Sequence, residues 1–123
     1  MTKDIVNDGM KVRREVLGAQ HVDKAESKKD DFTEEFQNFI TRYAWGEIWT
    51  RPGLERKTRS CVTLAMMIAL HREDEFKLHI KAAVNNGLTK NEIKEVILQS
   101  AIYAGVPAAN SAFHWAQDVF DNS

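Results

Sequence analysis

The sequence contains few of the residues that cross-link small proteins, which are cysteines, or that interrupt helices, which are prolines and glycines. Among its 123 residues there are one cysteine, two prolines and six glycines. A lone thiol cannot close an internal disulfide, so a disulfide framework and thiol–disulfide catalysis by this chain alone are excluded. A reducing compartment is favoured. The cysteine, Cys61, lies in an apolar run and is expected to be buried and inert.

Charge of one sign and long apolar runs are missing as well. Lys and Arg number 17, Asp and Glu 18, and the net charge is −1. This balance argues against non-specific nucleic-acid binding. The longest apolar run, residues 61–70, is too short to span a bilayer, and the N-terminus lacks the apolar core of a signal peptide. We therefore expect a soluble cytoplasmic protein with no nucleic-acid or membrane partner.

Apolar residues recur at helical spacing over most of the chain, and the alternation typical of strands is absent. The pattern predicts about six helices, near residues 5–17, 31–50, 55–70, 74–86, 89–104 and 107–120. The charged stretch 20–31 is expected to be a loop or an exposed turn. Gly87 is predicted to cap the fourth helix, Thr89 and Glu92 to form a capping box, and Pro107 to open the last helix.

The third predicted helix, residues 55–70, is apolar on nearly all sides and is expected to be central and buried. The fold class that follows is all-α: a helical bundle in a single domain covering residues 1–123. Aromatic residues between 32 and 49 and small residues between 101 and 112 would supply contact surfaces. Together they favour a homo-oligomer.

Glu75 and His79 are the first candidates for chemistry. They lie four residues apart on one predicted helix, so their side chains are neighbours. A carboxylate beside an imidazole raises its basicity and fixes its orientation. The spacing alone favours a boundary histidine bonded to Glu75 over a catalytic one. His71 would complete a metal-ligand row only if the helix ran through residues 71–74, where we expect a break, so no metal site is predicted.

The second candidate is the segment Tyr43-Ala-Trp-Gly-Glu-Ile-Trp-Thr-Arg-Pro-Gly-Leu54, in which aromatic and charged residues surround a turn. Arg51 and the nearby Arg59 would hold carboxylates through bidentate bonds. The helix start after Gly53 would add backbone donors for an anion. An aromatic hinge with solvated arginines explains the same residues equally well.

Taken in order over about residues 30–120, these residues resemble the 4-carboxymuconolactone decarboxylase family. The resemblance is carried by the segment 43–54, by Arg59-Ser60, by Glu75-x-x-x-His79-x-x-x-Ala83, by Asn86-Gly-Leu-Thr89 and by Tyr103-Ala-Gly-Val-Pro-Ala-Ala109. Members of the wider alkylhydroperoxidase D-like superfamily carry a Cys-x-x-Cys just before the matching histidine. Here Arg72 and Glu75 occupy the cysteine positions, which removes the peroxide chemistry.

The resemblance implies an alkylhydroperoxidase D-like bundle, commonly a trimer or hexamer with sites near subunit contacts. The implied reaction is decarboxylation of 4-carboxymuconolactone to 3-oxoadipate enol-lactone and CO2, in protocatechuate catabolism by the β-ketoadipate pathway. No cofactor is implied, because the substrate is its own electron sink. Two alternatives stay open: a paralogue acting on another carboxylated lactone or small acid, and a non-catalytic helical oligomer or partner-binding module.

The family resemblance also implies roles for the acid–base candidates. His79, oriented by Glu75, would donate a proton or bond the lactone oxygen. Glu47 is a weaker acid–base candidate.

The remaining candidates would bind substrate. Arg51 and Arg59 would anchor the carboxylate that stays, and Trp45 and Trp49 would form an apolar wall that desolvates the departing one. This makes the segment around residues 45–59 the expected second wall of the site, from the same or a neighbouring subunit.

Overall fold

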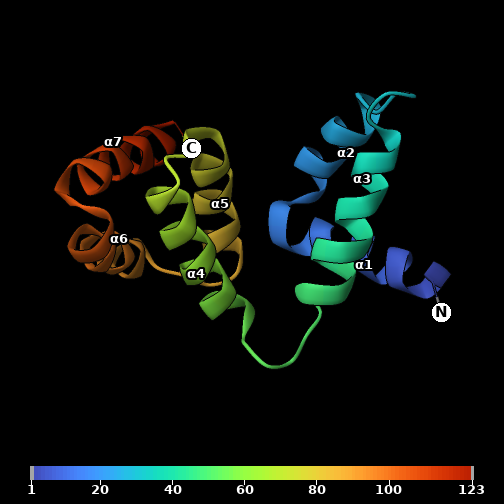
Figure 1. Ribbon diagram of the computed structural model, residues 1–123, viewed down its shortest axis with the longest axis horizontal. Helices are drawn as coiled ribbons and strands as arrows, with labels where there is room; N and C mark the ends of the chain where they lie inside the picture. Colours follow the sequence, from blue (N-terminus) through green and yellow to red (C-terminus); the bar gives the residue numbers. More distant parts are fainter. Residues whose placement is uncertain (1, 123) are drawn as a thin grey trace. The chain divides into compact units, whose positions relative to one another are not determined.

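A computed structural model describes residues 2–122 and the side chains of residues 4–122; over this range it is helical apart from short connections and contains no strand (Figure 1). The elements, in chain order, are α1 (Thr2–Leu17), α2 (Ala19–Ser27), α3 (Glu34–Ile40), the π-helix η1 (Thr41–Ile48), α4 (Arg56–Ala69), α5 (Glu73–Asn85), α6 (Lys90–Ala104) and α7 (Val106–Asp121). They form two compact units, of which the first ends at Glu55 and the second begins at Arg56. The all-α class is confirmed, while the single-domain organisation stays a prediction.

Helix α2 occupies residues 20–27 of the charged stretch for which a loop or exposed turn was predicted, so that prediction is wrong there and holds only for residues 28–31. Gly18 has φ +92°, which lets the chain turn sharply between α1 and α2. Only Val22 of α2 is buried, and Arg14 pairs with Asp23 at 2.7 Å. With a single apolar side chain turned inward, α2 shows no hydrophobic periodicity that a sequence pattern could detect.

In the first unit α1 packs closely along η1, and two glycines permit the approach. A Cβ on Gly9 would lie 2.2 Å from the carbonyl oxygen of Thr41, and a Cβ on Gly46 would lie 2.6 Å from that of Ile5. Arg13 of α1 is buried in this contact and donates a hydrogen bond to Thr41 Oγ1 at 3.3 Å. Any larger side chain at either glycine would force the two helices apart.

The helix that begins at Glu34 widens at Thr41 and continues as the π-helix η1. The N–H of Trp49 donates to the carbonyl of Ala44, five residues back, at 2.9 Å. Such widened turns are rare and frequently mark functional sites. The predicted helix over this region is confirmed, but its π geometry coincides with the Tyr-Ala-Trp-Gly-Glu-Ile motif and was not expected.

The second unit is a four-helix arrangement of α4 to α7 around one apolar core. Phe76 of α5 is fully buried and packs against Trp115 of α7, with ring centroids 5.8 Å apart. Helix α4 forms one wall of this core rather than its centre, because Val62 and Met66 point outward and are 41% and 55% exposed. The prediction that this helix is central and buried is therefore wrong for its outer face, while Leu64 and Ile68 on its inner face are buried.

The turns on both sides of α5 end the preceding helix in the same way. In each, two successive N–H groups bond back to carbonyls of the last turn, the Schellman arrangement. Gly87 fills the left-handed position after α5 with φ +98°, and His71 fills it after α4 with φ +57°. The break predicted between residues 71 and 74 is confirmed, although it is closed by a histidine instead of a glycine.

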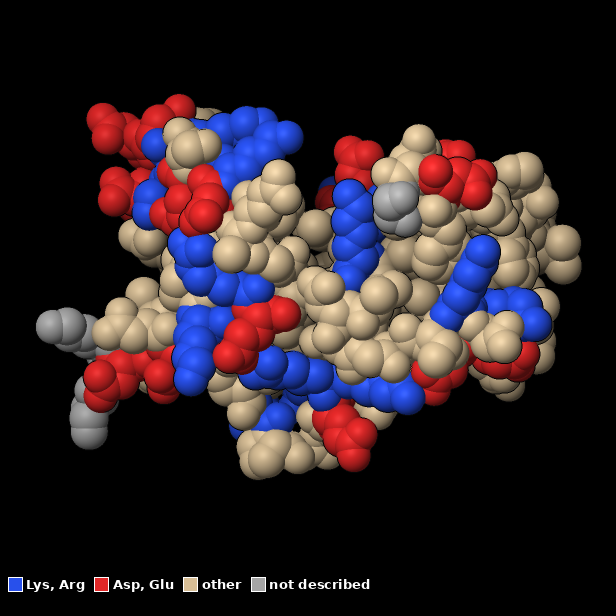
Figure 2. Space-filling view, turned by 180° about the vertical axis from the view of Figure 1, so that it is seen from behind, with Lys and Arg blue, Asp and Glu red and all other residues tan. Residues whose placement is uncertain are grey.

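The helix starts follow the predicted capping signals. Thr89 Oγ1 accepts from the N–H of Glu92 at 3.1 Å, and Glu92 Oε1 accepts from the N–H of Thr89 at 2.9 Å, so the capping box is confirmed. Pro107 lies in the first turn of α7, one residue after Val106. Both acidic and basic side chains appear on the face shown in Figure 2, in keeping with the balanced charge. Within the described residues, each helix is too short or too polar to cross a membrane.

Candidate active site

The structure divides the seven candidate residues between the two units. Four belong to η1 and the turn that follows it, and three belong to α4 and α5. The first set is Trp45, Glu47, Trp49 and Arg51; the second set is Arg59, Glu75 and His79.

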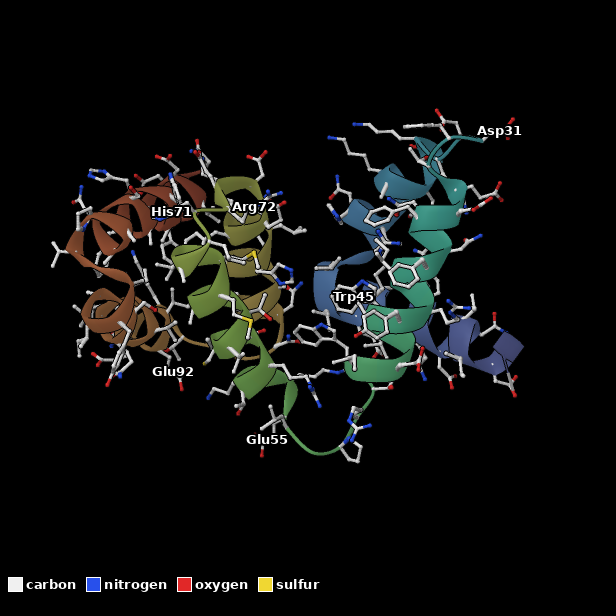
Figure 3. All side chains as sticks on the ribbon, in the orientation of Figure 1. Asp31, Trp45, Glu55, His71, Arg72 and Glu92 are labelled. Atoms are coloured by element: carbon white, nitrogen blue, oxygen red, sulfur yellow. The ribbon has the colours of Figure 1, made fainter. Side chains whose placement is uncertain are left out.

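The two tryptophans of the first set form one aromatic surface. Trp45 and Trp49 stack with ring centroids 5.1 Å apart and planes inclined by 28°. Trp45 (labelled in Figure 3) is only 6% exposed, and Trp49 is half-buried. A stacked pair of this kind presents a rigid apolar face, which is what an apolar wall for a substrate requires.

Glu47 and Arg51 lie at the exposed end of the same segment. The backbone N–H of Arg51 donates to the carbonyl of Ile48 at 3.0 Å, which ties the turn to the end of η1. Helix α4 begins at Arg56, so the expected helix start after Gly53 is present three residues further along.

The first turn of α4 gathers positive charge. Arg56, Lys57 and Arg59 all lie there, and that turn holds no acidic residue. Lys57 pairs with Glu92 of α6 at 3.0 Å. The positive end of the helix dipole adds to the field of these cations. The beginning of α4 therefore suits a carboxylate ligand better than a cationic or neutral one.

Glu75 lies in the first turn of α5, and its carboxylate accepts a hydrogen bond from Nη2 of Arg72. This bond lowers the pKa of Glu75, and the charge of His79 contributes a smaller effect in the same direction. The carboxylate consequently stays ionised over the neutral pH range. The sequence comparison indicates Arg72 only as a residue at a cysteine position of the superfamily. The opposite charges of Arg72 and Glu75, three residues apart, are the sequence signal that predicts this ion pair.

His79 follows Glu75 by one helical turn and is half-buried, at the edge of the face that buries Phe76, Ile80 and Ala83. Its Nδ1 atom has almost no exposed surface. The edge position predicted for this histidine is confirmed.

His71 does not share the helix of Glu75 and His79. It lies in the turn before α5, beside Arg72 in Figure 3, so the register required for a row of three metal ligands is broken. Among the described residues no three His, Cys, Asp or Glu side chains are grouped to hold a metal ion. The metal-ligand alternative on a continuous helix is thereby ruled out for these three residues.

A cavity of about 640 Å³ lies between α4 and α6 and is lined mainly by apolar side chains. None of the seven candidate residues lines it. Cys61 does, and it is half-buried rather than fully buried. Burial, followed by the charge of Glu92, raises the pKa of the Cys61 thiol, so the thiol stays protonated at neutral pH and is a poor nucleophile, as expected. Its described lining includes the carboxylates of Glu92 and Glu95 and no Lys or Arg side chain, so this cavity does not suit an anionic ligand.

Comparison with known proteins gives a consistent set of relatives. The profile of the carboxymuconolactone decarboxylase family matches residues 34–118, a range that contains all seven candidates. A 4-carboxymuconolactone decarboxylase from Acinetobacter baylyi is 55% identical over 112 residues, which cover 91% of this chain and 84% of that protein. The nitrosuccinic acid decarboxylase npaB of Metarhizium robertsii is 43% identical over 108 residues, covering 88% and 76%.

Proposed function

The chain belongs to the carboxymuconolactone decarboxylase family, and from this we propose that it converts 4-carboxymuconolactone to 3-oxoadipate enol-lactone and CO2. The observation that carries the proposal is the 55% identity, over 91% of the chain, to a protein named for that activity. The reaction would place the protein in protocatechuate breakdown by the β-ketoadipate pathway.

The chemistry of the substrate defines what the protein must supply. The bond from the γ-carbon of the unsaturated lactone to its carboxylate breaks, and the electron pair moves through the ring double bond to the lactone carbonyl. A dienolate results, CO2 leaves, and a proton added at the α-carbon completes the product. The protein needs to orient the substrate, stabilise the developing negative charge and deliver that proton.

His79 is the residue we assign to proton delivery or to a hydrogen bond with the lactone oxygen. Glu75, one helical turn earlier, places a carboxylate beside the imidazole, and a general acid at this position needs the imidazole in its protonated form. Glu47, on the exposed end of η1, is the weaker acid–base candidate.

Arg59 and Arg51 are assigned to the carboxylate that stays on the substrate. The positive charge in the first turn of α4 supports this role for Arg59. The stacked surface of Trp45 and Trp49 would contact the departing carboxylate and weaken its hydration, which favours loss of neutral CO2.

A second candidate substrate is a small α-nitro dicarboxylic acid. The 43% identity to a nitrosuccinic acid decarboxylase supports it. In such a substrate the nitro group accepts the electron pair in place of the lactone carbonyl, and one carboxylate again remains to be anchored. For either substrate the protein would need to anchor the remaining carboxylate and to supply a proton donor.

We further propose a cytoplasmic homo-oligomer, a trimer or hexamer. Phe32, in the turn before α3, and Phe36, in the first half of α3, are 94% and 61% exposed. Apolar side chains so exposed are typical of contact surfaces. Light scattering after size exclusion tests this proposal, and a monomer at micromolar concentration would contradict it.

The proposed activity is tested with the purified full chain and the two substrates in parallel, following CO2 release and loss of substrate absorbance. We expect the lactone to turn over far above its uncatalysed rate and at least about tenfold faster than nitrosuccinate, since a single misplaced polar group costs on the order of one to three kcal/mol. Preferred turnover of nitrosuccinate would favour the second candidate. Binding of the lactone diacid without turnover would favour a non-catalytic module.

A further inference from the structure

Arg72 lies in the turn between α4 and α5, and its backbone is hydrogen-bonded to both helices. Its N–H donates to the carbonyl of Met67 in α4 at 2.9 Å, and its carbonyl accepts from the N–H of Phe76 in α5 at 2.9 Å. Phe76 is fully buried in the core of the second unit. The base of the Arg72 side chain is therefore held on both sides by packed helices.

From this base the guanidinium reaches the carboxylate of Glu75, three residues further on. Both side chains are about half exposed. An exposed ion pair of this kind adds little to the free energy of unfolding. What it does determine is local: which way the carboxylate of Glu75 points.

Glu75 is also the helical neighbour of His79, four residues away on the same helix. Its carboxylate accepts a hydrogen bond from the Arg72 guanidinium in the preceding turn and is close enough to His79 in the following one to interact electrostatically with it. A second ion pair on the same helix joins Lys77 Nζ to Glu73 Oε2 at 2.9 Å, and it does not involve His79.

We infer that Arg72 is a positioning residue: it holds the carboxylate of Glu75 in the orientation that directs the imidazole of His79 during proton transfer. The inference rests on the proposed decarboxylase function. Arg72 itself does not touch the substrate in this arrangement, and its effect passes entirely through Glu75.

Kinetics with 4-carboxymuconolactone test the inference through Arg72→Ala, Arg72→Lys, Glu75→Ala and the double variant Arg72→Ala/Glu75→Ala. We expect Arg72→Ala to lower kcat about tenfold, a part of the roughly 10²–10⁴-fold that a general acid supplies, with KM within about twofold. Arg72→Lys should retain most of the wild-type kcat, because lysine keeps the positive charge beside Glu75. The double variant should be no slower than Glu75→Ala alone, because the two residues act in series.

Glu73→Ala is the matched control: it removes an ion pair of the same helix turn and should leave kcat unchanged, while Lys77 keeps its contact with Asp118. Normal kcat for Arg72→Ala beside a large loss for His79→Ala would overturn the inference and leave the decarboxylase function standing.

An NMR measurement makes the test independent of turnover. At fixed neutral pH, Arg72→Ala should shift the ring resonances of His79, and the same change in a Glu75→Ala background should not. Identical ring resonances with and without Arg72 would overturn the inference, even if the protein decarboxylated neither substrate.

Discussion

Single residues carry the proposed chemistry, and His79 carries most of it. Its ring lies at the edge of the buried face of α5, and an ionised carboxylate precedes it by one turn. We expect His79→Ala to lower kcat by about 10²-fold or more, the usual contribution of a positioned proton donor. Steady-state kinetics measure this, with far-UV circular dichroism to verify that the variant is folded. A near-normal kcat would exclude proton donation by His79.

Arg59 is expected to act on binding rather than on the chemical step. Loss of its charge-assisted hydrogen bonds to a carboxylate should raise KM about tenfold or more in Arg59→Ala, since such bonds contribute roughly 1.5–3 kcal/mol. Arg51→Ala should act in the same direction. Arg42→Ala, at an exposed position of η1, is the control and should change nothing. If neither Arg51→Ala nor Arg59→Ala alters KM or kcat, the anchoring role is wrong.

At the scale of elements, the contact of α1 with η1 depends on Gly46. A Cβ there would lie 2.6 Å from the Ile5 carbonyl oxygen, a backbone atom that cannot move aside alone. We expect Gly46→Ala to lower the free energy of unfolding by about 1–3 kcal/mol, the range for overpacking, and to weaken the near-UV signal of the stacked tryptophans. Gly53→Ala meets no atom within 4 Å and serves as the control. Equal stability of the two variants in urea would contradict the close contact.

The turn between α4 and α5 is the second element that invites a test. His71 adopts φ +57°, where a residue with a Cβ is strained by about 1–2 kcal/mol. His71→Gly should therefore stabilise the protein by about 0.5–1 kcal/mol, after the entropy that glycine adds to the unfolded chain. Gly87→Ala, at the equivalent position after α5, should have the opposite sign. Thermal and urea unfolding measure both changes, and a destabilising His71→Gly would mean that the side chain makes a compensating contact.

At the scale of the whole molecule, acidic and basic residues nearly balance, so pH acts through individual groups. Glu75 and Glu92 have lowered pKa values because of hydrogen bonds from Arg72 and from the Thr89 backbone. Their contribution to stability is present above the ordinary pKa of glutamate and is lost as the pH falls through their folded values. Cys61 has a raised pKa, so its contribution is present below the ordinary thiol pKa and is lost as the pH rises through the higher folded value.

Urea unfolding across pH should therefore show stability falling at both ends. The alkaline decline should be smaller in Cys61→Ala, whereas the acid decline should be slightly smaller in Lys57→Ala/Arg72→Ala, which removes the side-chain donors to Glu92 and Glu75. An alkaline limb unchanged by Cys61→Ala would contradict the burial of that thiol.

The sequence by itself determined the all-α class, the capping box at Thr89, the break before α5 and the glycine that ends it. It also identified the residues shared with the decarboxylases. These features depend on hydrogen bonds and periodicities that span fewer than about five residues, so the local sequence is enough to predict them.

Tertiary structure alone decided the rest. Helix α2 buries only Val22, α4 forms one wall of the core because Val62 and Met66 face outward, and η1 packs closely against α1 where Gly9 and Gly46 meet. The orientation of Arg72 likewise depends on bonds to two different helices. Each of these outcomes depends on packing between residues far apart in sequence. A local sequence pattern does not indicate which distant side chain will contact a given residue.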